Sequence, residues 1–263
     1  MKLALLSDVH ANIQGLEACL EHARVRGADQ IAILGDLVGY GANPSEVVNR
    51  VMGLAQNGAW LVKGNHDVMA VNPPAIARTL GDSTAAWTHA QLSTSQRAFL
   101  AQMPLTAQHG SVYLVHASVD EPAKWRYVYE LEAALDSLEA LTQIESARHV
   151  FVGHVHQQTL YRRSRAADFE AVELLAFQLG SGRGRRGYSG QTLVLDPQSH
   201  WLATVGSAGQ PRDANPQAMY ALFDTTTFSF EFHRVDYDHL EAAAAIRRAG
   251  LPAWLASRLE LGR

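Results

Sequence analysis

The sequence contains one cysteine, three lysines and no long hydrophobic run, and these shortages exclude several classes of protein. With Cys19 alone, the chain has no internal disulfide and no cluster of thiolate metal ligands. No apolar run approaches the ~18 residues of a membrane span, so a transmembrane protein is not expected. Too few apolar residues precede Asp8 to form the ~7-residue core of a signal peptide, so we expect a cytoplasmic location. The net charge of −4 argues against a general attraction to nucleic acid or anionic membranes.

The composition is that of a folded protein with a sizeable core. Apolar residues make up 47% of the 263 residues and charged residues 18%, which is typical of globular chains. No internal repeat and no linker-like segment divides the sequence, so we expect a single domain over residues 1–263. Cys19 lies among apolar neighbours, which favours a buried thiol.

Five short apolar runs predict strands covered on both faces, because their apolar residues are continuous rather than alternating. They are residues 3–6, 31–34, 60–62, 112–115 and 150–152. A helical pattern at 13–20, with Asn12 as its N-cap, separates the first two runs. A second helix is expected after Asn43, with Pro44 in its first turn and Glu46 completing a capping box. This β-α-β-α-β order implies parallel strands with right-handed crossovers.

The second half of the chain predicts more helices and a different kind of strand. Helical regions are expected at residues 73–103 and 130–142, the first with an internal cap at Ser93 or Thr94. From Phe228 to His233, apolar and polar residues alternate, which predicts a strand with one solvated face. A turn would pair it with residues 220–223. We therefore expect a second sheet that is at least partly antiparallel.

Each of the five apolar runs is followed by residues that bind metals or move protons. The clusters are Asp8-Val9-His10, Gly35-Asp36, Gly64-Asn65-His66-Asp67, His116 and Gly153-His154-Val155-His156. Any one of them has an ordinary structural explanation, since a strand-end Asp is often only a turn residue. Because the carboxyl ends of parallel strands meet at one edge of a sheet, we expect all five clusters to converge. Their conjunction favours a metal site.

In this order, the motifs D-x-H, G-D, G-N-H-D, H and G-H-x-H resemble the calcineurin-like metallophosphoesterase superfamily. Residues 39–46 and 206–213 resemble a branch of small bacterial and archaeal phosphoesterases within it. The resemblance implies an α/β fold, a four-layer αββα sandwich with two mostly mixed β-sheets flanked by helices. It also implies a hydrolase that cleaves a phosphodiester or a phosphomonoester, with nucleotides and dinucleoside polyphosphates among the candidate substrates.

The resemblance implies two metal ions and assigns their ligands. Asp8, His10, Asp36 and His156 would hold one ion, and Asp36, Asn65, His116 and His154 would hold the other, with Asp36 as the bridge. A hydroxide bridging the ions would attack phosphorus in line with the leaving oxygen. The thiol-free, imidazole-rich set suits divalent Mn, Fe, Zn or Ni better than Ca or Mg.

The same resemblance makes His66 a catalytic residue rather than a metal ligand. It would stabilise charge on the phosphoryl oxygens and protonate the leaving alkoxide. Asp67 would orient the His66 ring and raise its basicity, and a capping role within the loop is the alternative. Tyr40 and Arg212 are candidates for substrate contact, with turn anchoring as the alternative.

Two weaker features leave both interpretations open. Trp125 and Tyr127 either pack within their loop or stack on a nucleobase. The Arg-rich region 162–186 forms either a solvated strand face with a loop or a rim that grips phosphate. Its arginines are Arg162, Arg163, Arg165, Arg183, Arg185 and Arg186.

The expected partner is a small phosphorylated substrate, with no membrane, nucleic acid disfavoured and the oligomeric state open. Three rival functions remain. A nuclease would need a basic groove or a further DNA-contacting domain, and a Ser/Thr protein phosphatase would need a peptide groove. A non-catalytic scaffold of the same fold should lack some ligands or His66, and here all are present.

Overall fold

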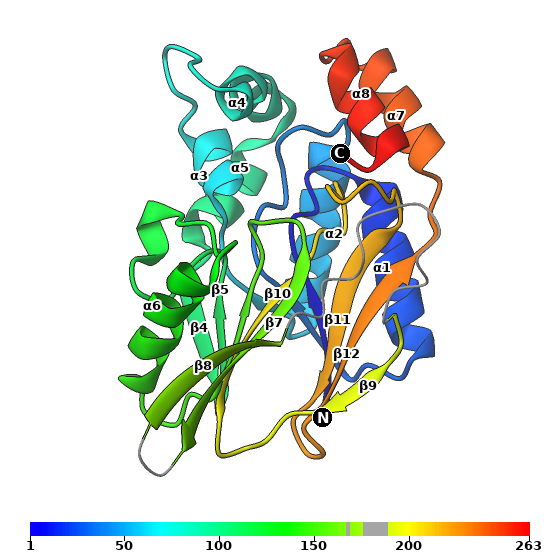
Figure 1. The fold of residues 1–263 in the computed structure, drawn as a ribbon. Helices are drawn as coiled ribbons and strands as arrows, with labels where there is room; N and C mark the ends of the chain where they lie inside the picture. Colours follow the sequence, from blue (N-terminus) through cyan, green and yellow to red (C-terminus); the bar gives the residue numbers. More distant parts are fainter. Residues whose placement is uncertain (167–168, 176–188) are drawn as a thin grey trace.

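The computed structural model describes residues 1–166, 169–175 and 189–263, and the strands of these residues form two six-stranded sheets (Figure 1). In order across the sheet, the first contains β3 (Trp60–Leu61), β2 (Gln30–Ile33), β1 (Lys2–Leu6), β11 (Ala218–Asp224), β12 (Ser229–Val235) and β9 (Thr192–Val194). The second contains β4 (Thr106–His109), β5 (Val112–Val115), β6 (His149–Val152), β10 (His200–Val205), β7 (Gln158–Ala166) and β8 (Phe169–Leu175).

The two sheets pack face to face and helices cover their outer faces (Figure 1). A core that includes Leu5 and Phe151 lies between the sheets. Helices α1 (Ile13–Val25) and α2 (Pro44–Gln56) pack on the first sheet, and α6 (Leu131–Thr142) packs on the second. The predicted four-layer αββα sandwich is therefore confirmed.

Strand β1 explains why the apolar runs are unbroken. Leu3 and Leu5 point into the core between the sheets, whereas Ala4 and Leu6 point into the core under the helices. All four are fully buried. A strand that is covered on both faces needs apolar residues at every position.

The five apolar strands are divided between the two sheets, which the sequence analysis did not foresee. Strands β1, β2 and β3 are parallel in the first sheet, and β5 and β6 are parallel in the second. The polar clusters meet because the carboxyl ends of both groups lie at the same end of the sandwich. One direct link is the hydrogen bond from the His154 N–H to Asp8 (2.9 Å).

The C-terminal hairpin forms as predicted but belongs to the first sheet. Strands β11 and β12 pair antiparallel, and β11 pairs with β1. The predicted solvated face of β12 is only partly present: Ser229 and Glu231 are half-buried, and His233 is covered by α1. His233 is only 3% exposed and stacks on Tyr220, which accepts or donates a hydrogen bond at His22 of α1 (2.7 Å).

Two predicted helix starts differ in their capping. The Asn12 side chain accepts a hydrogen bond from the Gly15 N–H at the start of α1, as expected. At α2 the predicted capping box is absent: the Asn43 side chain makes no cap and instead donates to Glu46 (3.4 Å). The Asn43 N–H is bound to the carbonyl of Ala11, which fixes this loop against the first strand's loop.

The remaining helices surround the carboxyl ends of the strands. They are α3 (Asn65–Val71), α4 (Leu80–Gln91), α5 (Thr94–Gln102), a 3-10 turn at Pro122–Lys124, α7 (His239–Arg248) and α8 (Ala253–Leu261). Ser93 caps α5, as predicted, but residues 73–79 are not helical, and α3, α7 and α8 were not predicted. None of the helices in the described residues is long and apolar enough to cross a membrane.

Candidate metal centre

The five polar clusters meet at one place, and most of their side chains are buried. Asn65 is half-buried, and the buried members are Asp8, His10, Asp36, His66, Asp67, His116, His154 and His156. Three groups of these residues have nitrogen or oxygen atoms within 4.8 Å of one another. They are Asp8–His10–His156, His10–Asp36–His66 and Asp36–His116–His154. Because His10 and Asp36 each belong to two groups, the three groups form one continuous centre.

Asp36 lies between the two halves of this centre. In one half, His156 Nε2 is 3.2 Å from Asp8 Oδ1 and 3.1 Å from His10 Nε2. In the other, His116 Nε2 is 3.3 Å from Asp36 Oδ2 and 3.2 Å from His154 Nδ1. His10 Nε2 also lies 3.8 Å from Asp36 Oδ2, so this one oxygen is close to both halves.

Backbone carbonyls hold three of the imidazole rings. The Nδ1 atom of His10 lies 3.2 Å from the Val38 carbonyl. Those of His116 and His156 lie 2.6 Å from the carbonyls of Leu34 and Gln210. A carbonyl only accepts, so each Nδ1 carries the proton and each Nε2 presents its lone pair to the centre.

Backbone N–H groups orient the two carboxylates in the same way. The His66 N–H donates to Asp36 Oδ1 (2.8 Å), and the His154 N–H donates to Asp8 Oδ2 (2.9 Å). The other oxygen of each carboxylate faces the imidazoles. These backbone contacts therefore leave one oxygen of each carboxylate free and pointing into the centre.

The inward atoms are acceptors that face one another, which fits a cation. His10 Nε2 and His156 Nε2 lie 3.1 Å apart, and two lone pairs at that distance repel unless a proton or a metal lies between them. Neighbouring ligands on an ion with bonds of ~2.1 Å are spaced by about this distance. Asp8 Oδ1, Asn65 Oδ1 and His154 Nε2 are buried without a hydrogen-bond partner in the described part of the chain. Buried polar atoms seldom remain unpaired, so these residues fit a divalent transition metal.

Five of the predicted ligands have a left-handed backbone. The φ angles of Asp8, His10, Asp36, His154 and His156 lie between 46° and 66°. A non-glycine residue in this region costs roughly 1–2 kcal/mol. Such strain persists only where the surrounding structure imposes it, and it gathers at functional sites.

Gly64 allows the third loop to come close to Asp36. A Cβ atom at this position would lie 2.1 Å from Asp36 Oδ1 and 2.5 Å from the Asp36 nitrogen. Both are far below contact distance, so any side chain would displace the carboxylate. The glycine ahead of Asn65 is thus needed for the geometry of the centre.

The electrostatics keep the two carboxylates charged. Burial raises the pKa of Asp8, but the charge of His156 and hydrogen bonding with His10 and His156 more than offset this and bring the pKa well below its usual value. The pKa of Asp36 is lowered in the same way, with burial opposed by His116 and His66. Burial lowers the pKa of His116, yet Asp36 raises it to about 9, so the ring holds a second proton on Nε2 that a metal ion would displace. Asp8 and Asp36 are therefore anionic ligands at neutral pH.

His66 lies beside the two halves of the centre. Its ring packs edge-on to His10, with centroids 5.0 Å apart, and against Tyr40 at 4.4 Å. Burial lowers the pKa of His66 to about 3, although Asp36 opposes this shift. The ring is therefore neutral at pH 7 and carries one N–H. An anionic group next to it would raise its pKa.

Asp67 has the capping role that was the alternative to orienting His66. Its Oδ2 accepts from the Gly64 N–H (2.9 Å), and its Oδ1 accepts from the Leu37 N–H (2.9 Å). Both oxygens are thus bound to backbone, which ties the third loop to the second. The predicted bond to the His66 ring does not form among the described residues. Burial, with Asp36 nearby, raises the pKa of Asp67 to about 7.

Tyr40 and Arg212, the two candidates for substrate contact, lie beside the centre. The Tyr40 ring packs on His10 at 4.8 Å, and the Arg212 guanidinium carbon lies 5.8 Å from the Tyr40 ring centre. Tyr40 also has a left-handed backbone, with φ at 64°.

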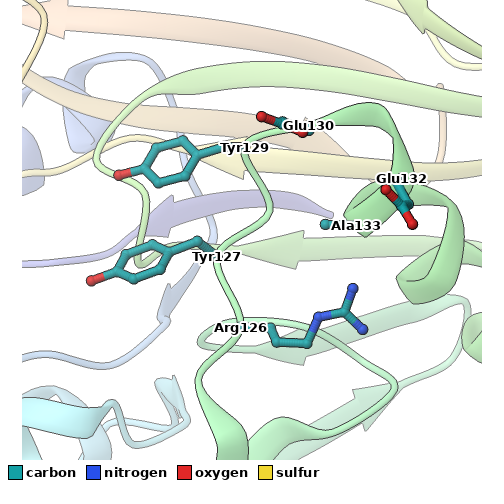
Figure 2. Close-up of a pocket in the computed structure, with 6 residues that line it drawn as sticks. All are labelled: Arg126, Tyr127, Tyr129, Glu130, Glu132 and Ala133. Atoms are coloured by element: carbon teal, nitrogen blue, oxygen red, sulfur yellow. The ribbon is translucent and has the colours of Figure 1, made fainter.

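The aromatic loop after β5 packs directly on the centre. Tyr127 stacks on His154 with centroids 4.0 Å apart, and Trp125 meets His116 edge-on at 6.0 Å. Figure 2 shows Tyr127 and Tyr129 extending to the same side of the segment, with their rings stacked at 5.2 Å. Together with Arg126, Glu130, Glu132 and Ala133, the two tyrosines line a pocket of about 220 Å³. Both tyrosines are about half exposed, so packing on the centre does not occupy the whole of either ring.

Only part of the Arg-rich region can be placed. Arg162 lies over the Trp201 ring at 5.6 Å and bonds to Ser199 (3.2 Å), which agrees with a solvated strand face. Arg183, Arg185 and Arg186 lie outside the described residues, and the side chain of Arg165 is not described. The phosphate-gripping rim therefore stays a prediction.

The carbonyls that orient the rings were not predicted from the sequence. Gln210 belongs to the stretch 206–213 that resembles a family motif, but the role of its carbonyl had no signal in the side-chain pattern. The same loop is bound to the first one: Ser207 Oγ donates to the Asp8 carbonyl (2.8 Å), and the Gly209 N–H donates to it at 3.0 Å. The loop at residues 206–213 therefore binds both the backbone of Asp8 and the ring of His156.

Comparison with known proteins gives consistent matches. The calcineurin-like phosphoesterase superfamily domain matches residues 1–227. An uncharacterized protein of Methanocaldococcus jannaschii is 32% identical over 267 residues, covering 99% of this chain and 98% of that one. The crystal structure of a metallophosphoesterase from Sphaerobacter thermophilus aligns over 100% of this chain and 99% of its own, with 33% identity and a TM-score of 0.81. A hypothetical protein of Pyrococcus horikoshii OT3 shares the fold, with 18% identity and a TM-score of 0.73 over 100% and 98% of the two chains.

Proposed function

Because the chain belongs to the calcineurin-like phosphoesterase superfamily, a family of hydrolases that act on phosphoester bonds, we propose that it hydrolyses a small phosphorylated substrate at a two-metal centre. The substrate would be a phosphomonoester or a phosphodiester, including nucleotides. One metal would be held by Asp8, His10, Asp36 and His156, and the other by Asp36, Asn65, His116 and His154. When bound, divalent ions supply Lewis acidity that acidifies water and polarises phosphoryl oxygens.

The side chains around the metals would position the substrate. The neutral His66 ring has one N–H, which would donate to a phosphoryl oxygen at the centre. An anionic phosphate beside His66 raises its pKa from the low value of the buried ring, so the ring then takes up the proton that the leaving oxygen needs. Tyr40, which packs against His66 on one side and Arg212 on the other, would restrict the direction from which the substrate enters.

One observation carries this proposal: Asp36 Oδ2 lies close to ligand atoms of both halves, 3.8 Å from His10 Nε2 and 3.3 Å from His116 Nε2. Among the side chains of the centre, only a carboxylate oxygen has both the negative charge and the spare lone pairs that a bridge between two cations requires. The five strained ligand positions support the same interpretation, because a scaffold without metals has no need of them.

The test is a metal-dependent assay. Protein stripped by a chelator is reloaded with Mn, Fe, Zn or Ni and assayed on p-nitrophenyl phosphate, bis(p-nitrophenyl) phosphate and diadenosine polyphosphates. We expect turnover of at least one substrate only after metal is added. Asp36→Asn should abolish it, whereas Asp29→Asn, on an exposed residue, should not. Metal-loaded protein with two bound ions and no turnover on any substrate would instead support the non-catalytic scaffold.

A further inference from the structure

Two arginines at the rim share one neutral acceptor. Arg212 donates to Gln210 Oε1 through Nη2 (2.9 Å) and Nε (3.3 Å), and Arg258 of α8 donates to the same oxygen through Nη1 (3.5 Å). Both arginines are half-buried. In the part of the chain that the structure describes, neither guanidinium has a carboxylate within 4.0 Å. Two like charges are thus held together without a counterion.

The acids next to them in sequence are already bound elsewhere. Asp213, which follows Arg212, pairs with Arg234. Glu260, two residues after Arg258, pairs with Arg247 (2.7 Å). The acids nearest in sequence to Arg212 and Arg258 therefore form ion pairs with other arginines and do not neutralise these two.

The pair is fixed in place by rigid contacts. Arg258 lies over the Trp254 ring at 4.9 Å, and Arg212 lies over Tyr40 at 5.8 Å. The end of α8 is bound to the Arg212 loop, because the Ala214 N–H donates to the Gly262 carbonyl (2.7 Å). Burial and the charge of Arg212 lower the pKa of Arg258, as expected for two cations in proximity.

The pair also adjoins the metal centre. Gln210, which holds both guanidinium groups, accepts from His156 Nδ1 through its backbone carbonyl (2.6 Å). Tyr40 separates Arg212 from His10 and His66. The charge of Arg212 also lowers the pKa of His156, after burial as the main cause. A group bound to the pair would therefore be a neighbour of a phosphoryl group bound at the centre.

We propose that Arg212 and Arg258 form a subsite for a second phosphoryl group, so that the preferred substrate is an organic diphosphate or polyphosphate. This inference rests on the proposed function, since the first phosphoryl group would occupy the metal centre. Two guanidinium groups match the two charges of a terminal phosphoryl group, and planar guanidinium forks bind its oxygens in pairs. A carboxylate would neutralise only one of the two.

Because Arg258 belongs to α8, this subsite depends on the helical hairpin formed by α7 and α8. The superfamily domain matches residues 1–227, whereas α8 begins at Ala253. Figure 1 shows α7 and α8 at the same end of the molecule as α3 and α4. The shared domain would supply the metal centre and Arg212, and the hairpin would add the second charge that selects the substrate.

The experiment measures binding of non-hydrolysable probes by calorimetry to metal-loaded protein. Methylenediphosphonate carries two phosphoryl-like groups, phosphonoacetate carries one and a carboxylate, and methylphosphonate carries one alone. We expect wild-type protein to bind methylenediphosphonate at least ~10-fold more tightly than either other probe. Arg258→Gln and Arg212→Gln should each reduce this preference by about 10-fold or more.

The control is Arg248→Gln, which removes the same charge from α7, where the arginine is exposed and pairs with Glu241. It should keep the full preference. An unchanged preference in both subsite variants would overturn the proposal, and tighter binding of phosphonoacetate than of methylenediphosphonate would overturn the assignment of a phosphoryl group. If Arg258→Gln does not fold, Arg212→Gln tests the same subsite from another element.

The two proposals fail in different ways. If no phosphoester is hydrolysed under any metal loading, the proposed function fails, but the preference among the three probes is still measured by calorimetry. If phosphoesters are hydrolysed and the probe preference is the same in wild type and both subsite variants, only the second phosphoryl subsite fails.

Discussion

The two ends of β6 place buried histidines in opposite environments. His149 begins the strand and lies among Phe223 and Phe228, and neither of its ring nitrogens has a hydrogen-bond partner in the described residues. His154 and His156 follow the end of the strand and meet a carboxylate and other imidazoles. Burial lowers the pKa of all three to about 4. A buried histidine with a lowered pKa is therefore not by itself evidence of a functional site. The groups that orient its ring nitrogens distinguish a functional histidine from a packing one.

The largest contrast should come from replacing one histidine at each end by phenylalanine. His156→Phe removes a ligand atom that lies 3.2 Å from Asp8 Oδ1 and 3.1 Å from His10 Nε2. We expect bound metal to fall and kcat/KM to drop by more than ~100-fold, since even residues that only support ligands cost 10–100-fold. His149→Phe should leave both unchanged. Metal content by elemental analysis and turnover on an aryl phosphate measure this, and equal losses in the two variants would erase the contrast.

At the metal centre, substitution of His66 should have a different effect from substitution of a predicted metal ligand. His66→Ala removes a ring that, among the residues the structure describes, no carbonyl orients in the way His10, His116 and His156 are oriented. We expect kcat to fall about 10²–10⁴-fold with both metals retained, as for loss of a general acid. Loss of metal in this variant would instead make His66 a ligand, consistent with its nitrogen lying within 4.8 Å of ligand atoms of His10 and Asp36.

The glycine that joins β6 to its histidines should show an intermediate effect. A Cβ atom on Gly153 would lie 1.8 Å from Ser7 Oγ and 2.5 Å from Asp8 Oδ2. Gly153→Ala should therefore displace Asp8 and weaken metal binding by about 10–100-fold. Gly53→Ala, on α2 with nothing within 4 Å, is the matched control and should leave metal affinity unchanged. Metal titration of the apo proteins distinguishes them, and wild-type affinity in Gly153→Ala would show that the loop can relax.

Local motifs explain what could be predicted from the sequence. The order of Asp8, Asp36, His116 and His156 after apolar runs is a local pattern, and strand ends place such residues at a sheet edge whatever the rest of the chain does. The division of the strands between two sheets could not be predicted, because a run such as 112–115 has the same pattern in either sheet. Left-handed backbone at Asp8 or His154 had no signal, since it depends on hydrogen bonds from distant loops.

Long-range packing also explains the specific errors. His233 alternates with apolar residues and was expected in solvent, but α1 covers its face. For Asp67 both orienting His66 and capping the loop were expected as alternatives, and the capping role forms because the backbone of Leu37, from another loop, binds its oxygen. Arg258 belongs to a short helix whose sequence does not distinguish it from a solvated arginine. In each case the partner lies far away in the sequence.

At the other end of β6, His149 should have no effect on turnover. It should instead affect how the stability of the protein depends on pH. Burial lowers the pKa of His149 from 6.5 to about 4; the Ser111 backbone opposes this shift, and His200 and Arg148 add to it. Above pH ~6.5 the residue is neutral in both folded and unfolded chains and contributes no pH dependence. As the pH falls from ~6.5 to ~4, the unfolded chain takes up a proton that the folded one does not, so stability is lost. Each pH unit in this window costs about 1.4 kcal/mol.

His149→Phe should remove this loss, because the ring then has no proton to bind. The free energy of unfolding of the variant, relative to wild type, should rise by about 3 kcal/mol between pH 7 and pH 4. The histidines of the metal centre titrate in both proteins and cancel in the difference. Urea unfolding at several pH values measures this difference in the free energy of unfolding. His89→Phe is the control, because the half-buried His89 ring, unlike that of His149, is hydrogen-bonded to a carbonyl, that of Ala70 (2.8 Å). A difference that does not change with pH would mean that His149 finds a partner for its proton, and the two ends of β6 would then be less distinct than their contacts indicate.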